Sequence, residues 1–159
     1  MYRILIVDDH ADQREFLQFL LTSHNADWVI TEASNGKEAL TLCQNETFDF
    51  LITDVKMPFL SGIELAESLR KIGVELPILF ISGYDDFQYV KKALTLHAID
   101  YLLKPINPSD FHHRLDSMIT DYLSSKEEKA HLIEIQRLQK QQIITNILHG
   151  VSAKDVSHK

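Results

Sequence analysis

Five short apolar segments recur along the first two thirds of the chain, separated by polar stretches of helical length. They are rich in Ile, Val, Leu and aromatic residues, and several are apolar throughout instead of alternating with polar residues. Such continuous runs are typical of strands that are covered on both faces. The predicted strands are Ile4–Val7, Trp28–Ile30, Phe50–Thr53, Ile78–Ile81 and Ile99–Leu103.

The stretches between these strands carry apolar residues at helical spacing and begin with capping signals. Three of them start with a capping side chain three residues before Glu or Gln, and a fourth starts with Asn followed by Pro. These starts are at Asn35, Ser61, Asp85 and Asn107. Strands that alternate with helices predict an α/β fold with a parallel sheet.

The last helical stretch is much longer than the others. From Asn107 to Gly150 no Gly interrupts the chain and, after Pro108, no Pro, and this length exceeds what one domain needs to cover its sheet. Its first part is amphipathic and should pack on the sheet. Its later part keeps an apolar stripe with Gln and Lys at candidate heptad positions, which leaves a coiled coil open. Residues 151–159 are expected to fray or to begin a linker.

Composition is that of an ordinary soluble globular protein. Of the 159 residues, 45% are hydrophobic and 25% are charged, and no secretory signal or membrane-spanning segment is recognisable. The single cysteine, Cys43, cannot form an internal disulfide, which fits a reducing compartment. We therefore expect a cytoplasmic protein without a membrane partner.

The formal net charge of −7 is unevenly distributed along the chain. Residues 1–119 hold 10 Lys and Arg against 18 Asp and Glu, whereas residues 120–159 hold 6 against 5. Because phosphate contacts need clustered cations, the acidic body argues against direct nucleic-acid binding by this segment.

Polar residues with useful chemistry follow the ends of the predicted strands. These residues are Asp8 and Asp9 after the first strand, Asp54 after the third, Ser82 after the fourth and Lys104 after the fifth. In an open parallel sheet, ligands bind at the carboxyl ends of the strands, where the strand order reverses. Three neighbouring carboxylates repel one another unless positive charge lies between them. Mg²⁺, which binds carboxylate and water oxygens, would supply that charge. A carboxylate can also accept a phosphoryl group, whose charge a metal, an ammonium and a hydroxyl group would stabilise.

Four parts of the sequence together resemble the receiver domain of two-component response regulators, over about residues 2–123. They are Ile4–Asp9, Leu51–Pro58 with Ser61–Gly62, Phe80–Gly83 and Ala98–Pro105. The resemblance implies a flavodoxin-like, doubly wound sheet of five parallel strands in the order 2-1-3-4-5, with an extended C-terminal helix. It also implies a receiver domain at residues 1–123 and a helical linker or tail at residues 124–159, leading towards an output domain.

The resemblance assigns the acceptor and the metal ligands residue by residue. Asp54 matches the phosphoacceptor, and Asp9 matches the main carboxylate ligand of Mg²⁺ (or Mn²⁺). Asp8 matches a carboxylate that supports the metal through water. Lys56 matches the position whose backbone carbonyl completes the metal site together with Asp54.

The resemblance likewise assigns the residues that respond to phosphorylation. Lys104 matches the lysine that pairs with the phosphoryl group or with Asp54, and Ser82 matches the hydroxyl that turns inward to bond a phosphoryl oxygen. Tyr101 matches the aromatic residue that moves from exposed to buried as that hydroxyl moves. The bond between Lys104 and Pro105 is typically cis in this family.

The function implied by the resemblance is a phosphorylation switch, with no enzymatic activity beyond self-directed phosphotransfer and autodephosphorylation. A sensor histidine kinase would donate the phosphoryl group. A homodimer would form through the surface of the fourth helix, fifth strand and fifth helix, through the C-terminal helix, or through both. The segment Ser82–Ala93 with the long tail is similar to receivers that carry an AraC-type helix-turn-helix output. No such unit stands in this sequence, so DNA would be contacted only through an output domain outside it.

Three other interpretations fit less well. A stand-alone receiver would leave the long tail unexplained. A Mg²⁺-dependent aspartyl phosphatase typically has two Asp residues two positions apart after the first strand, whereas Asp8 and Asp9 are adjacent. A flavin or nucleotide site lacks its Gly-rich loop after that strand. The eight histidines show no zinc spacing, and His10 is expected to be exposed at a helix start.

Lys56 and Tyr84 stand two residues after Asp54 and Ser82 and flank the predicted acceptor. We hypothesise that they set the lifetime of the phosphoryl state, and that the bulky ring of Tyr84 hinders the attacking water. Tyr84→Ala should then lose its phosphoryl group faster than the wild type, measured as the rate of autodephosphorylation. An unchanged or slower rate would contradict this role.

Overall fold

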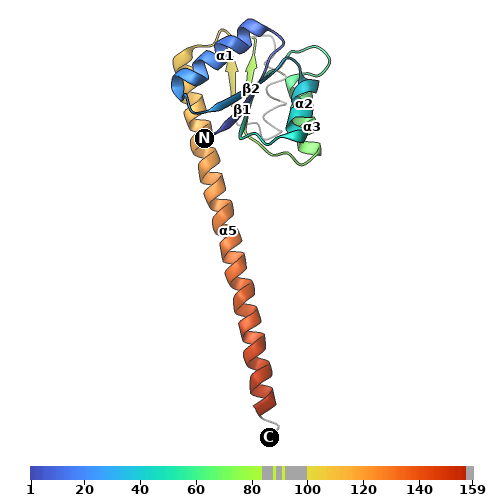
Figure 1. Cartoon of the computed structure of the whole chain (residues 1–159), viewed down its shortest axis with the longest axis vertical. Coiled ribbons are helices and arrows are strands. Elements are labelled where there is room, and N and C mark those ends of the chain that lie inside the picture. Colours follow the sequence, from blue (N-terminus) through green and yellow to red (C-terminus); the bar gives the residue numbers. More distant parts are fainter. Residues whose placement is uncertain (84–87, 89–90, 92–99, 157–159) are drawn as a thin grey trace. The chain divides into compact units, whose positions relative to one another are not determined.

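The computed structural model of the chain describes residues 1–83, 88, 91 and 100–156. Five parallel strands form one sheet in the order β2-β1-β3-β4-β5 (Figure 1), which confirms the predicted flavodoxin-like topology. The strands are β1 (Arg3–Val7), β2 (Val29–Ala33), β3 (Phe50–Asp54), β4 (Ile78–Ser82) and β5 (Asp100–Leu103). The helices are α1 (Ala11–His24), α2 (Gly36–Asn45), α3 (Gly62–Lys71) and α5 (Pro108–Val156). The helix start predicted at Asp85 lies outside the described residues.

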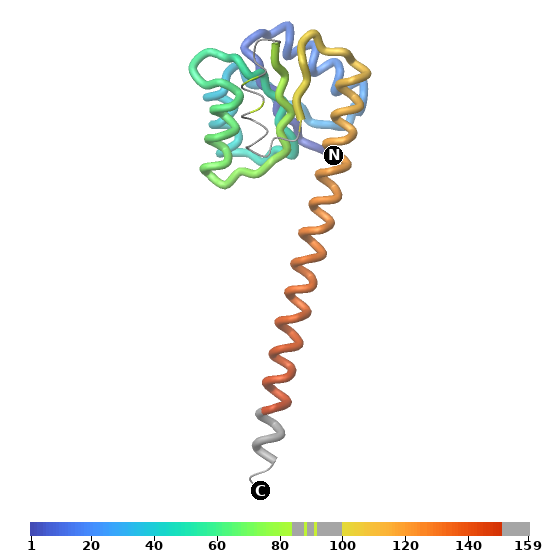
Figure 2. Tube along the Cα trace, turned by 180° about the vertical axis from the view of Figure 1, so that it is seen from behind, coloured from blue at the N-terminus to red at the C-terminus, as the bar shows by residue number. Residues whose placement is uncertain are grey.

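Both faces of the sheet are covered, as the continuous apolar runs predicted. Successive strand residues point to opposite faces, and every residue of β3 and β4 is buried. On one face α2 and α3 lie side by side (Figure 1), and Leu65 and Leu69 of α3 share a core cluster with Leu5 of β1. On the other face α1 lies beside the first turns of α5 (Figure 2), where His112 Nε2 donates to the carbonyl oxygen of Leu20 across 2.9 Å. This double cover leaves the strand ends as the places where polar side chains gather.

The second strand differs from its prediction. The apolar run predicted a strand at Trp28–Ile30, but β2 runs from Val29 to Ala33 and includes Thr31 and Glu32. β2 is at the edge of the sheet, so part of it faces water and hydrophobicity does not mark its length.

Three of the predicted helix caps are present. The side chains of Asn35, Ser61 and Asn107 each accept a hydrogen bond from the backbone N–H three residues later, at 2.8, 3.1 and 3.1 Å. Each bond satisfies an amide that has no partner within its own helix. The caps therefore define where α2, α3 and α5 begin.

The chain divides into two compact units, Met1–Met118 and Ile119–Lys159, and α5 contributes to both. Within the second unit the helix continues to Val156, so the fraying predicted for residues 151–159 is wrong for residues 151–156, and the alternative that a linker begins there stays a prediction. The reason is that no proline or further glycine follows Gly150 to end the helix. The helices that the structure describes include none with a stretch long and apolar enough to span a membrane.

Gly62, the first residue of α3, lies against the end of β3. Its N–H donates to the carbonyl oxygen of Val55 across 2.9 Å. A Cβ added at Gly62 would stand 2.1 Å from the carbonyl oxygen of Asp54, a backbone atom that no side-chain rotation can move. The close approach of α3 to the last residue of β3 therefore requires glycine at this position.

Gly62→Ala should lower the free energy of unfolding by about 1–3 kcal/mol, the usual effect of overpacking a tight site. Gly150→Ala is the matched control, because a Cβ there meets nothing within 4 Å and alanine favours the helix. Chemical denaturation measures both variants. Wild-type stability of Gly62→Ala would contradict the close contact.

Candidate functional site

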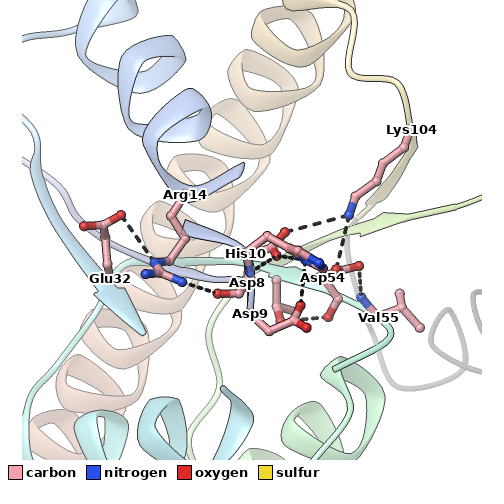
Figure 3. Close-up of polar contacts among 9 residues, drawn as sticks. Asp8, Asp9, His10, Arg14, Glu32, Asp54, Val55 and Lys104 are labelled. Carbon is pink, nitrogen blue, oxygen red and sulfur yellow. Dashed lines mark hydrogen bonds and ion pairs between the residues drawn. The ribbon is translucent and has the colours of Figure 1, made fainter. Parts of the chain in front are cut away.

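The carboxyl ends of the strands bring together side chains that are far apart in the sequence (Figure 3). Asp8 follows β1, Asp54 ends β3 and Lys104 follows β5. The register pairs Val7 of β1 with Thr53 of β3, so these two strands end side by side. The predicted polar residues at the strand ends therefore meet at one edge of the sheet, where ligands of such folds bind.

Asp54 is a buried carboxylate with a donor on each oxygen. The Val55 N–H donates to Oδ1 across 2.8 Å, and Lys104 Nζ donates to Oδ2 across 3.2 Å. The Asp54 side chain is only 7% exposed. Burial raises the pKa of Asp54 above its usual value, while the Lys104 ammonium opposes this rise and the charge of Asp8 adds to it.

Asp8 is the second buried carboxylate of the site. Its Oδ1 accepts from the backbone N–H of His10 across 2.9 Å, and its Oδ2 lies 3.8 Å from Lys104 Nζ. Arg14 of α1 donates from Nη1 to the Asp8 carbonyl oxygen across 2.7 Å, and its Nε lies 3.6 Å from Glu32 Oε1 of β2. Arg14 thus ties the end of β1 to α1 and β2 (Figure 3).

The residues around Asp54 offer a set of ligand atoms for a metal ion. One such atom from each of Asp8, Asp9, His10 and Asp54 lies within 4.8 Å of all the others. Carboxylate oxygens are the hard ligands that Mg²⁺ prefers, and a divalent cation would offset the repulsion among three carboxylates. The donor set therefore fits a divalent cation such as Mg²⁺.

Ser82, the last residue of β4, carries a buried hydroxyl. Its side chain is fully buried, and its Oγ has no partner in the part of the chain that the structure describes. A buried hydroxyl without a partner is unfavourable. Its Oγ is therefore available to a group that enters the site.

The remaining predicted site residues lie as follows. Tyr101 pairs with Phe80 in the sheet register and is half-buried against the core. Lys56 is exposed, two residues after β3 ends. The peptide bond between Lys104 and Pro105 is cis. Tyr84 lies outside the described residues.

His10 and Arg14 are the site residues that the sequence patterns missed. The predicted exposure of His10 is correct, since 64% of its side chain is exposed, yet its Nδ1 lies 3.3 Å from Asp8 Oδ1 and 3.1 Å from Asp9 Oδ1. Its position directly after two Asp residues was the available signal. For Arg14 the signal was its place in the first turns of a helix that begins at the strand end.

A sequence profile of the response regulator receiver domain matches residues 4–116 of the chain. Because this match covers most of the chain and the sheet order agrees, the chain belongs to the response regulator receiver domain family. Domains of this family are the signalling domains of two-component systems.

Several known proteins are similar to the chain. An uncharacterised response regulatory protein of Staphylococcus epidermidis is 30% identical over 145 residues, which are 88% of this chain and 57% of that protein. The transcriptional regulatory protein HptR of Staphylococcus aureus is 30% identical over 131 residues, 82% of this chain and 51% of that protein. The crystal structure of full-length FixJ from B. japonicum superposes with a TM-score of 0.72 and 29% identity, over 81% of this chain and 63% of that one. The chain thus spans little more than half the length of the curated relatives it matches.

Asp54→Asn should stabilise the protein when divalent cations are removed. The pKa of Asp54 is raised in the folded chain, so its ionisation costs stability, and the cost appears as the pH rises through the folded-state pKa. Asn removes the charge but keeps a carbonyl oxygen for the Val55 N–H. The melting temperature at pH 7 with chelator should rise by a few degrees, or about 1 kcal/mol.

The difference in melting temperature between Asp54→Asn and the wild type should shrink as the pH falls towards about 4, near the pKa of an unperturbed Asp. Added Mg²⁺ should stabilise the wild type more than Asp54→Asn, because binding to the folded state alone raises stability. A lower melting temperature of Asp54→Asn with chelator at pH 7 would contradict the raised pKa.

Proposed function

We propose that the chain is the receiver part of a response regulator, which accepts a phosphoryl group from a sensor histidine kinase on Asp54. The observation that carries this proposal is the placement of Asp54 as a buried carboxylate 3.2 Å from Lys104 Nζ, in a set of metal-ligating atoms with Asp8 and Asp9. A carboxylate in such surroundings can act as a nucleophile towards phosphorus.

In the transfer, an oxygen of Asp54 forms a bond to phosphorus while the phosphorus–nitrogen bond of the donor phosphohistidine breaks. The Val55 N–H holds Oδ1 at 2.8 Å and so orients the carboxylate. The leaving nitrogen keeps the electron pair of the broken bond, and the ring departs as a neutral imidazole because its other nitrogen is protonated. Orientation and charge stabilisation are most of what phosphoryl transfer asks of a protein.

Lys104, together with a metal ion that the acidic residues would hold, would stabilise the transferred group. A bound Mg²⁺ supplies positive charge beside the phosphoryl oxygens. Asp9 and Asp54, the backbone carbonyl of Lys56 and, through water, Asp8 would hold that ion. The Lys104 ammonium already lies near Asp54 and Asp8, so it can turn to a phosphoryl oxygen without a large movement.

Ser82 and Tyr101 are the proposed response to phosphorylation. The buried Oγ of Ser82 has no hydrogen bond in the described part of the chain, so a bond to a phosphoryl oxygen would satisfy it. Tyr101, half-buried in the neighbouring strand, would follow by packing more deeply. Movement of these two side chains would alter the surface formed around β5 and α5.

Transcriptional output and dimerisation complete the proposal. HptR, which is similar over most of this chain, is named a transcriptional regulatory protein, and the curated relatives are longer than this chain. We propose an AraC-type DNA-binding output domain beyond residues 1–123 and the tail 124–159. We also propose a homodimer that brings two output domains together, through the surface of β5 and α5, the C-terminal helix, or both.

The phosphorylation proposal is tested by intact mass after incubation with acetyl phosphate and Mg²⁺. The wild type should gain the mass of one phosphoryl group, whereas Asp54→Asn and a chelator-treated sample should gain none. Asp110→Asn is the matched control, because Asp110 is an exposed carboxylate in the first turn of α5 and its loss should leave the adduct intact. An adduct on Asp54→Asn, or a folded wild type that neither gains mass nor binds beryllofluoride, would refute the assignment.

A further inference from the structure

The helix of the second unit exposes large apolar side chains at Leu123 and again from Leu132 to Leu148. The exposed fractions of these side chains range from 37% to 66%. The residues are Leu123, Leu132, Ile133, Ile135, Leu138, Ile143, Ile144, Ile147 and Leu148. Repeated exposure of large apolar residues along one element is a mark of an interaction surface.

Four of these side chains, those of Leu123, Ile133, Ile144 and Ile147, fall on one heptad series, in which positions are taken alternately three and four residues apart. The series 123, 126, 130, 133, 137, 140, 144 and 147 holds five apolar residues of eight: Leu123, Ala130, Ile133, Ile144 and Ile147. A competing series runs through positions 128, 131, 135, 138, 142, 145 and 149. Only two of its seven residues, Ile135 and Leu138, are apolar. The first series is therefore the better candidate for the seam of a coiled coil.

We propose that residues 123–150 pair with a second copy of this chain as a parallel, in-register, two-stranded coiled coil. This deepens the homodimer of the proposed function by giving its segment, orientation and contacts. The seam positions contact one another across the axis, and the residues that flank the seam decide the orientation of the two helices.

Charge and apolar complementarity of the flanking residues favour the parallel arrangement. In a parallel pair, the residue directly before the first seam position of each heptad (residues 129, 136 and 143) faces the residue five positions later on the second copy. Lys129 then faces Glu134 of the second copy, and Ile143 faces Leu148 of the second copy. Residues five apart on one helix do not face each other, so a single chain cannot make these pairs.

An antiparallel pair would lose this complementarity. In that arrangement the flanking positions after the seam face one another, and in the order of the chain they are Glu127, Glu134, Gln141 and Leu148. Glu134 would then lie opposite one of these four residues of the second copy and not opposite Lys129. The parallel pair thus makes use of the unlike charges, and the antiparallel pair does not.

In the parallel, in-register pair, three seam cations, Lys126, Arg137 and Lys140, each face the same residue of the second copy, and this repulsion weakens the pair. Lys126 Nζ lies 4.8 Å from the ring centre of Tyr122, and Arg137 Nη2 lies 2.7 Å from Glu134 Oε1. Within one chain the Glu134 carboxylate thus already binds Arg137, so in the dimer it is shared between Arg137 and Lys129 of the second copy. The long stems of the three seam cations can cover the neighbouring apolar residues while the charged ends stay in water. Charged seam residues specify register and a low oligomer state at a cost in stability, which fits a dimer that dissociates readily.

The orientation is tested by exchanging the charges at 129 and 134 in the full chain. Sedimentation should show Lys129→Glu and Glu134→Lys each shifted towards monomer, with dissociation constants raised about tenfold or more. An equimolar mixture of the two should form a heterodimer, because both of its flanking pairs again join unlike charges. Glu128→Lys is the matched control, since this residue lies on the outer face and its reversal should leave the dimer unchanged.

The register is tested by disulfide cross-linking of Ile133→Cys, a seam position, against Ile135→Cys, an outer position. Burial raises the pKa of the native Cys43 thiol to about 11, so Cys43 should contribute little background. Ile133→Cys should form covalent dimers and Ile135→Cys should not. More cross-linking at 135, no heterodimer in the mixture, or a monomeric wild type with and without acetyl phosphate and Mg²⁺ would overturn the proposal.

The phosphoryl adduct is measured on the same samples. Absence of both the adduct and beryllofluoride binding, with the heterodimer retained, would refute the acceptor assignment and leave the coiled coil standing. An intact adduct with no heterodimer would refute the coiled coil alone.

Discussion

The arrangement of the site depends on the repulsion between two buried carboxylates, Asp54 and Asp8, and on the Lys104 ammonium, which lies near both. Lys104 Nζ is 3.2 Å from Asp54 Oδ2 and 3.8 Å from Asp8 Oδ2. Burial nevertheless raises the pKa of Asp54, so this cation does not fully offset the cost of the charge. Further positive charge is therefore favourable at this edge, and a divalent cation and the reactivity of Asp54 are linked through the same electrostatics.

The scaffold keeps these charges close together without letting them relax. β3 and β4 are buried along their whole length, and Gly62 brings the start of α3 against the Asp54 carbonyl. Arg14 holds the carbonyl oxygen of Asp8 from α1. Packed strands and backbone contacts of this kind are stiff, so polar groups at the strand ends keep their geometry.

The second unit presents a different kind of surface. Its helix carries apolar residues at heptad spacing near both ends of the segment 123–150, with Arg137 and Lys140 between them. A seam of this composition would favour pairing that is weak and specific in register over pairing that is tight. Such pairing would suit a switch, because a small contribution from the receiver could then decide whether two chains associate.

The sequence by itself determined the topology and the residues gathered at the site. Continuous apolar runs predicted buried parallel strands, and the rule that ligands bind at strand ends then selected Asp8, Asp9, Asp54, Ser82 and Lys104. Tertiary structure alone decided the length of the edge strand β2, the approach of the His10 ring to Asp8 and Asp9, and the unpaired state of Ser82 Oγ within the described chain. The physical reason is that hydrophobic periodicity reports which residues are buried. Side-chain contacts depend on which elements meet in space, and the local sequence does not encode how close two distant elements come.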